Sequence, residues 1–240
     1  MQFRITFQVL QPGQLMPLSY QYELSSWIYS RIHQSDSEFA NFLHGQGYGL
    51  DNKRFKLFTF SNLWVPPRYE IIDDRMKVWS REISFVVSFL VPRAAAELIT
   101  GLFKEHRFAL GDKISRLDLK TQTIEVLQPL EERSGTLQLR ATSPILLSKA
   151  HRNTQGKLQH DYLAPSAPDY AERFLNNLLK KHQSALAHGL AAPLPEVYET
   201  HFKCLSPKPK SSLIRIKADG DNSICGEGWK ALDGEFPLGS

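Results

Sequence analysis

Three residues between Tyr20 and Leu63 have side chains that can transfer protons or carry a positive charge near neutral pH. They are Tyr29, His44 fifteen residues later, and Lys56 twelve residues beyond that. A histidine has an ordinary pKa of about 6.5, so a positioned imidazole can act as an acid or a base. A lysine supplies a fixed positive charge. Because such residues are common in any soluble protein, the elements that hold them must decide whether they form one site.

Hydrophobic periodicity predicts a helix for Tyr29 and a second, short helix before His44. From Leu18 onwards the apolar residues fall on one helical stripe, and these are Tyr20, Leu24, Trp27, Ile28 and Ile32. Tyr29 lies about 100° around the helix from Ile28, on the flank of that stripe, where its hydroxyl can reach solvent or a cleft instead of the core. Ser37 to Leu43 is predicted to be helical, with Asp36 or Ser37 as its cap, and His44 follows beside the glycines of HGQGYG.

The rest of the first half reads as strand, helix, two strands, helix and strand. Residues 2–10 alternate strictly, with Phe3, Ile5, Phe7 and Val9 on one face. The further predicted elements are strands at Phe55 to Leu63 and Lys77 to Val91, a helix opened by Pro92 with an apolar stripe of Ala95, Leu98, Ile99, Leu102 and Phe103, and a strand near Ile114 to Val126. This β-α-β-β-α-β order is the ferredoxin-like plan.

The second half begins the same order again after a polar linker at Gln128 to Gly135. Its predicted elements are a strand at Thr136 to Leu147, a helix signalled by Ser166, Pro168 and Asp169 and running through Ala171 to Leu186, and strands near Glu196 to Leu205, Ser211 to Ala218 and Ile224 to Leu232. The sequence therefore predicts an α+β protein of two tandem ferredoxin-like (RRM-like) domains, 1–127 and 136–240. The second is expected to be incomplete, without its last helix and strand.

Composition excludes several classes of protein. The 240 residues contain no apolar run near the length of about 20 that a membrane span requires, and the N-terminus alternates where a signal peptide has an apolar block. We therefore expect a soluble cytoplasmic protein with no membrane partner. The two cysteines, Cys204 and Cys225, have no zinc-finger spacing, and the acidic pairs Asp73-Asp74 and Glu131-Glu132 have no histidine at ligand spacing. No metal site is predicted.

The phosphate-binding motifs of nucleotide enzymes are also missing. The GQGYG segment at Gly45 to Gly49 follows a short helix and leads into a polar loop, whereas a dinucleotide fingerprint opens a long helix. The sequence contains no GxxxxGK[ST] motif. Positive charge is instead concentrated in two spans without acids, Ser148 to His160 and His201 to Ala218. Two such spans, with a net charge of +4, favour a polyphosphate partner over two unrelated solvated faces.

Several segments together resemble the CRISPR-associated repeat-RNA endoribonuclease family, the sixth Cas family, which trims CRISPR transcripts into guide RNAs. The matching segments, in the family's order, are YQYELSSWIYSRI, FLHGQGY, FKLFTFSNL, ATSPILL, YLAPSAPDYAERFLNNLLKKH, LSPKPK and SICGEGWKALDGEF. The resemblance implies tandem ferredoxin-like domains and an activity without metal or cofactor, in which a 2′-hydroxyl of the RNA attacks the adjacent phosphate. The family's glycine-rich RNA-binding loop is not found in this sequence.

The resemblance also assigns the catalytic residues. Members with a catalytic triad have a tyrosine in the first helix, a histidine in an FLH-like segment and a lysine before an LFTFS-like strand, which here are Tyr29, His44 and Lys56. The residue types fit the reaction, because it requires one proton removed, one proton donated and a charge stabilised at the phosphate. Which of His44 and Tyr29 is the base stays open at this point.

Other assignments compete with this one. His33 lies one helical turn from Tyr29, and Lys53 or Arg54 could replace Lys56. CRISPR repeat RNA is the expected nucleic-acid partner, and other subunits of a CRISPR effector complex are the expected protein partners. The protein itself is expected to be a monomer or a homodimer. The predicted RNA-binding residues are Lys53, Arg54, Lys149, Arg152, Lys157, Lys208, Lys210, Arg215 and Lys217. The alternatives are a non-catalytic RNA-binding subunit, although RRM-type aromatic motifs are absent, and an interaction protein without a nucleic-acid partner.

Overall fold

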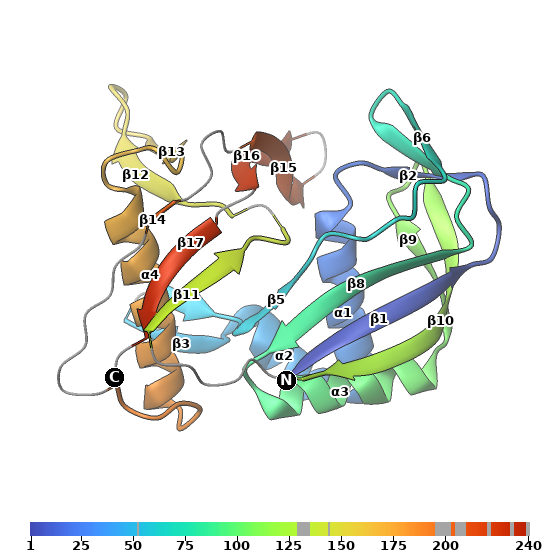
Figure 1. Ribbon diagram of the computed structural model, residues 1–240, viewed down its shortest axis with the longest axis horizontal. Coiled ribbons are helices and arrows are strands. Elements are labelled where there is room, and N and C mark those ends of the chain that lie inside the picture. The colour runs from blue at the N-terminus through green and yellow to red at the C-terminus, as the bar shows by residue number, and fades with distance from the viewer. Residues whose placement is uncertain are drawn as a thin grey trace. The chain divides into compact units, whose positions relative to one another are not determined.

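The computed structural model describes residues 1–51, 53–128, 135–143, 145–194, 203–204, 210–219, 222–230 and 233–238. For residues 135–139 and 203–238 the description covers the backbone alone. The chain divides into two compact units, Met1–Pro129 and Leu130–Ser240, and each has its own helices and sheets (Figure 1). Within the described residues, no helix combines the length and the apolar character needed to cross a membrane.

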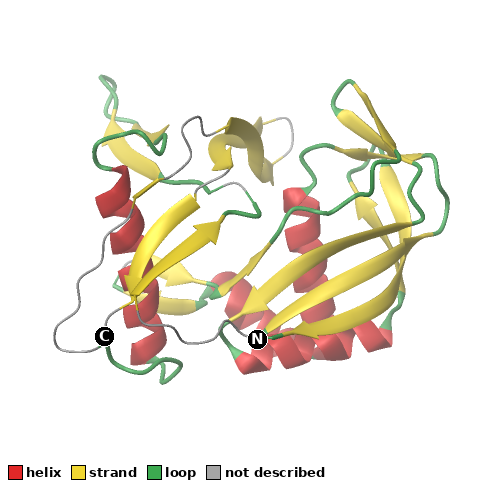
Figure 2. Ribbon diagram, in the orientation of Figure 1, coloured by secondary structure: helices red, strands yellow, loops and turns green. Residues whose placement is uncertain are grey.

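Unit 1 is built on a five-stranded antiparallel sheet with strand order β5-β8-β1-β10-β9. The strands are β5 (Phe58–Phe60), β8 (Glu82–Phe89), β1 (Gln2–Val9), β10 (Arg116–Leu127) and β9 (Arg107–Gly111). Two helices, α1 (Gln21–Ser35) and α3 (Pro92–Lys104), cover one face of this sheet (Figures 1 and 2). Along the chain, β1-α1-β5-β8-α3-β10 has the predicted β-α-β-β-α-β order. In this connectivity both helices, α1 and α3, pack on the same face of the sheet.

The core of unit 1 lies between this sheet and the two helices. The alternation of β1 buries Phe3, Ile5, Phe7 and Val9, and the whole predicted stripe of α1 is buried as well. The Phe7 ring lies edge-on to Trp27 of α1, with ring centroids 5.1 Å apart. Burial of one such large apolar side chain typically stabilises a fold by about 1.5–3 kcal/mol. This packing fixes the rotation of α1 on the sheet, and with it the direction of Tyr29.

Smaller elements are inserted into this plan. A three-stranded sheet of order β2-β7-β6 consists of β2 (Gln14–Pro17), β7 (Arg75–Val78) and β6 (Tyr69–Ile72). A short helix, α2 (Ser37–Gly45), follows α1 and leads into a hairpin of β3 (Tyr48–Leu50) and β4 (Lys53–Phe55). The buried hydroxyl of Tyr20 accepts a hydrogen bond of 2.8 Å from the Leu63 backbone N–H. That contact joins the start of α1 to the segment after β5.

Several predictions for unit 1 need correction. The continuous strand expected at Phe55 to Leu63 is broken, because Leu57 adopts a left-handed conformation with φ of 52° between β4 and β5. The strand expected at Lys77 to Val91 is likewise two strands, β7 and β8. Phe103 was expected in the core but is 67% exposed, because the buried stripe of α3 turns towards Ala94. Strand β9 was not predicted.

The described residues of unit 2 form a three-stranded sheet, two separate hairpins and one long helix. The sheet has the order β11-β17-β14, from β11 (Gly135–Arg140), β17 (Asp233–Leu238) and β14 (Lys203–Cys204). The hairpins are β12 (Ser148–Arg152) with β13 (Leu158–Tyr162), and β15 (Lys210–Asp219) with β16 (Asn222–Lys230). The helix is α4 (Tyr170–Ala187), close to its predicted bounds (Figure 2).

The strands of unit 2 differ from the prediction in their pairing. The first strand, β11, ends at Arg140 instead of the predicted Leu147. It begins at Gly135, which had been predicted as part of the linker. Residues 129–134 of that linker lie outside the described residues. The strands expected at Ser211 to Ala218 and Ile224 to Leu232 pair with each other as β15 and β16. The strand that pairs with β11 is instead β17, which the sequence did not predict. The basic span from Ser148 to His160, for which no strand was predicted, forms most of the hairpin β12–β13.

Candidate functional site

The structure brings the three predicted catalytic residues together in unit 1. Tyr29 lies on α1, His44 in the last turn of α2, and Lys56 between β4 and β5. The rings of Tyr29 and His44 meet edge to face, with centroids 5.3 Å apart and planes at 83°. The Lys56 ammonium donates hydrogen bonds to the backbone carbonyls of Leu43 and His44. One phenol, one imidazole and one ammonium group therefore converge at the end of α2.

Tyr29 is held by a second aromatic contact that the sequence did not reveal. Its ring also meets Phe58 of β5, with centroids 5.6 Å apart and planes at 75°. Partial burial raises the pKa of the Tyr29 hydroxyl to about 12. The phenol therefore keeps its proton throughout the neutral range, and it can act as a hydrogen-bond donor there.

The C-terminus of α2 is bound by two cations. Besides the two bonds from Lys56, the Arg54 guanidinium donates a hydrogen bond of 2.9 Å to the Gly45 carbonyl. These carbonyls are among the last of the helix, which have no partner within it and form the negative end of its dipole. Desolvation by burial, and then the neighbouring charge of Arg54, lower the pKa of Lys56. Lys56 thus fixes the backbone that carries His44 and also places a positive charge there.

Two backbone conformations shape the loop around Lys56. Gly47 has φ of 59°, and a Cβ there would lie 2.7 Å from the Phe55 carbonyl oxygen, so only glycine fits this turn. Leu57 has φ of 52°, which is uncommon for a residue with a side chain and costs energy. It lies between Lys56, which reaches α2, and Phe58, which reaches Tyr29. The strained residue therefore separates two side chains that serve different parts of the site.

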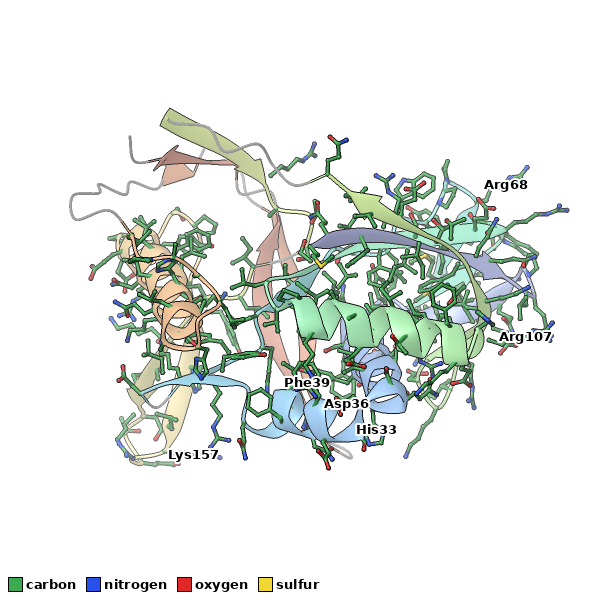
Figure 3. The ribbon with its side chains drawn as sticks, turned by 90° about the horizontal axis from the view of Figure 1, so that it is seen from below. His33, Asp36, Phe39, Arg68, Arg107 and Lys157 are labelled. Carbon is green, nitrogen blue, oxygen red and sulfur yellow. The ribbon has the colours of Figure 1, made fainter. Side chains whose placement is uncertain are left out.

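The start of α2 is also fixed by side-chain contacts. Asp36 caps the helix by accepting a hydrogen bond of 2.9 Å from the Phe39 backbone N–H, and it pairs with Arg93 at 2.5 Å. The hydrogen bonds from the Phe39 N–H and from Arg93 lower the pKa of Asp36. In Figure 3, Asp36, Phe39 and His33, the alternative catalytic histidine, lie near one another where α1 ends and α2 begins. His33 is exposed, and the ring contacts of Tyr29 in the described part of the chain are with His44 and Phe58.

The predicted RNA-binding residues lie in both units. Lys53 and Arg54 lie on β4, both exposed, and Arg54 is tied to α2. In unit 2, Lys149, Arg152 and Lys157 are exposed on the β12–β13 hairpin; Figure 3 marks Lys157. The backbone of Lys210, Arg215 and Lys217 lies in β15, while Lys208 is outside the described residues. Both units thus carry basic residues, and within unit 1 Arg54 lies next to the candidate catalytic groups.

Comparisons with known proteins match both units. Residues 15–117 match the family model for the N-terminal part of the CRISPR-associated protein Cas6, and residues 127–230 match the model for its C-terminal part. A relative named CRISPR-associated endoribonuclease Cas6 1, from Methanocaldococcus jannaschii, is 26% identical over 178 residues. That alignment covers 71% of this chain and 61% of the relative, so the chain spans less than two thirds of that protein.

Solved structures have the same fold over the whole chain. A Cas6-related protein from Pyrococcus furiosus aligns with a TM-score of 0.75 at 21% identity, covering 100% of this chain and 87% of that one. A RAMP protein described as binding different RNA substrates aligns with a TM-score of 0.73 at 19% identity, covering 100% and 88%. These structures share the fold of the chain, and the two consecutive family matches show that the chain belongs to the Cas6 family of CRISPR-associated proteins.

Proposed function

We propose that this protein is a metal-independent endoribonuclease that cuts CRISPR precursor RNA within its repeats to produce guide RNAs. The 2′-hydroxyl beside the cut attacks the phosphate and leaves 2′,3′-cyclic phosphate and 5′-hydroxyl ends. The observation that carries the proposal is the convergence of Tyr29, His44 and Lys56 in a chain of the Cas6 family. The name of the Methanocaldococcus jannaschii relative supports the same activity. The connectivity of unit 1, and the β11-β17-β14 order of unit 2, support two tandem ferredoxin-like domains.

Each of the three side chains has a role in this mechanism. The exposed imidazole of His44 removes the proton of the 2′-hydroxyl, because Tyr29 keeps its own proton below about pH 12 and is therefore suited to donate. Tyr29 donates its proton to the 5′-oxygen that leaves, so one proton is removed and one is supplied. The Lys56 ammonium stabilises the negative charge that develops on the phosphate. The basic residues of β4 and of the β12–β13 hairpin contact phosphates elsewhere along the RNA, which sets affinity and not the place of cleavage.

Product analysis in the absence of divalent cations tests this proposal. The full chain is incubated with candidate repeat RNAs in EDTA, and the ends of the products are identified by phosphatase and kinase treatment followed by mass spectrometry. Cyclic phosphate and 5′-hydroxyl ends are expected. Cleavage that stops in EDTA and returns with magnesium, or products with 5′-phosphate ends, would exclude the mechanism.

A second function is a non-catalytic subunit that holds guide RNA in a CRISPR complex. It is favoured by the bonds of Lys56, since two of the three ammonium donors are already used by the carbonyls of α2. The fold shared with an RNA-binding RAMP protein is compatible with it. Tight binding of repeat RNA without any product, even with enzyme in excess, would favour this function over cleavage.

The pH dependence of cleavage should report the charge of Lys56. Because burial and Arg54 lower its pKa, the cleavage rate is expected to fall as pH rises, at a lower pH than for an ordinary lysine. Tyr29 is not the cause of this fall, since its pKa is about 12. In Lys56→Arg the guanidinium stays charged, so the alkaline fall should disappear. Single-turnover rates between pH 6 and pH 10 measure the effect, and an unchanged alkaline fall in Lys56→Arg would contradict it.

A further inference from the structure

A hollow beside the β6–β7 hairpin carries exposed aromatic and basic side chains that the proposed catalytic site does not use. Its volume is about 540 Å³, and its walls include Arg68, Tyr69, Trp79 and Arg81, which we call the hairpin surface. Within unit 1, β6 lies at the end away from α2 and β3 (Figure 1). The hairpin surface is therefore a separate feature of unit 1, remote from His44.

Both rings of the hairpin surface are exposed, and the ring of Trp79 is held in place. Tyr69 is 45% exposed and Trp79 is 43% exposed. The Trp79 indole packs so closely on Gly13 that a Cβ there would lie 2.8 Å from the ring, and the Trp79 backbone N–H donates a hydrogen bond of 2.7 Å to the Arg68 carbonyl. Lys77 places its ammonium 4.8 Å from the centroid of the indole. A ring that is ordered before binding loses little conformational entropy when a ligand stacks on it.

The charges around the rings favour an anion. Arg68 and Arg81 are both exposed, and neither side chain has an ion pair or hydrogen bond with the described part of the chain. The acid on this wall, Glu70, lies directly opposite Lys77 in the β6–β7 register, so the charge of Lys77 offsets it. The two guanidinium groups of the hollow are left without a compensating acid.

We propose that the hairpin surface binds unpaired nucleotides of the RNA at a distance from the cleaved bond. Exposed aromatic rings stack on bases of any sequence, while arginines beside them contact phosphates or stack in turn. A protein partner also favours tryptophan, tyrosine and arginine, but it would need acidic side chains at matching positions to compensate the two arginines, whereas every RNA nucleotide brings a phosphate. That the bound RNA is CRISPR repeat RNA rests on the proposed function. That these residues bind single-stranded RNA does not rest on it.

Binding of a short RNA separates this surface from the catalytic site. Fluorescence anisotropy of a labelled oligouridylate of about ten nucleotides is measured with the full chain and with an Arg68→Ala/Tyr69→Ala variant, both in a His44→Ala background. Loss of one stacked base is expected to weaken binding at least about 5-fold, and loss of one phosphate contact should make the slope of log K against log salt shallower by about one. Arg107→Ala/Phe103→Ala is the matched control, since it removes one exposed arginine and one exposed aromatic ring elsewhere in unit 1.

The outcomes distinguish this inference from the proposed function. Equal affinity of the His44→Ala chain with and without the Arg68→Ala/Tyr69→Ala changes would overturn the inference, even if the wild-type enzyme cleaves repeat RNA. A variant that binds RNA normally but loses concentration-dependent self-association in sedimentation would assign the hairpin surface to a protein contact and overturn it as well. If the wild-type chain never cleaves RNA, the proposed function fails, while selective loss of oligouridylate binding still supports the hairpin surface.

Discussion

His44→Ala is expected to lower the single-turnover rate of repeat-RNA cleavage by about 10²–10⁴-fold, the usual contribution of one positioned proton transfer. The side chain is exposed at the end of α2, so its removal leaves no cavity in the core. The two bonds from Lys56 reach the backbone of α2 and remain available in the variant. Folding and RNA affinity should therefore be nearly unchanged. Rates at saturating enzyme, with affinity measured separately, distinguish a loss of chemistry from a loss of binding.

His33→Ala is the matched control for this prediction. Both histidines are exposed and lie in the last turns of consecutive helices, but only His44 contacts the Tyr29 ring. Cleavage by His33→Ala should match the wild-type rate. A loss of activity in His33→Ala with full activity in His44→Ala would exchange the roles of the two residues, and full activity in both variants would exclude histidine catalysis at this junction.

The elements that hold the catalytic residues could be predicted because their periodicity is strong and local. The strict alternation of β1 and the apolar stripe of α1 each identify a buried face without knowledge of the partner element. Tyr29 could be placed beside that stripe for the same reason. Asp36, one of the two predicted caps, caps α2 at its predicted start. The helix runs two residues beyond the predicted Leu43, to Gly45, so His44 lies within its last turn.

The contacts that join these elements could not be predicted from the same signals. The left-handed Leu57 interrupts a run of strand-forming residues, and strand propensity does not report the sign of φ. The Phe58 ring, which contacts Tyr29, follows directly after that interruption. In unit 2, β11 pairs with β17 across about a hundred residues of chain, from Gly135 opposite Leu238 to Arg140 opposite Asp233. A local pattern contains no information about such a pairing.

Gly101→Ala is expected to destabilise unit 1 by about 3 kcal/mol or more, although alanine is the better helix former. A Cβ at this position of α3 would lie 1.9 Å from the Arg31 carbonyl oxygen of α1, and a backbone atom cannot move aside by changing a rotamer. Figure 3 shows the two helices together against the sheet. Arg31 is itself 5% exposed and paired with Glu105 at 2.6 Å, so α1 cannot shift there without disturbing a buried charge.

Gly45→Ala in α2 is the matched control, because a Cβ at that helical position meets no atom within 4 Å. The greater helix propensity of alanine should therefore be the main effect of this substitution. The unfolding free energy is expected to stay the same or to rise by up to about 1 kcal/mol. Urea unfolding of both variants, followed by circular dichroism, makes the comparison. Equal stabilities would mean that α1 and α3 separate easily. In that case the packing of α1 could not fix Tyr29 against His44, and the rigid junction that the proposed mechanism requires would be lost.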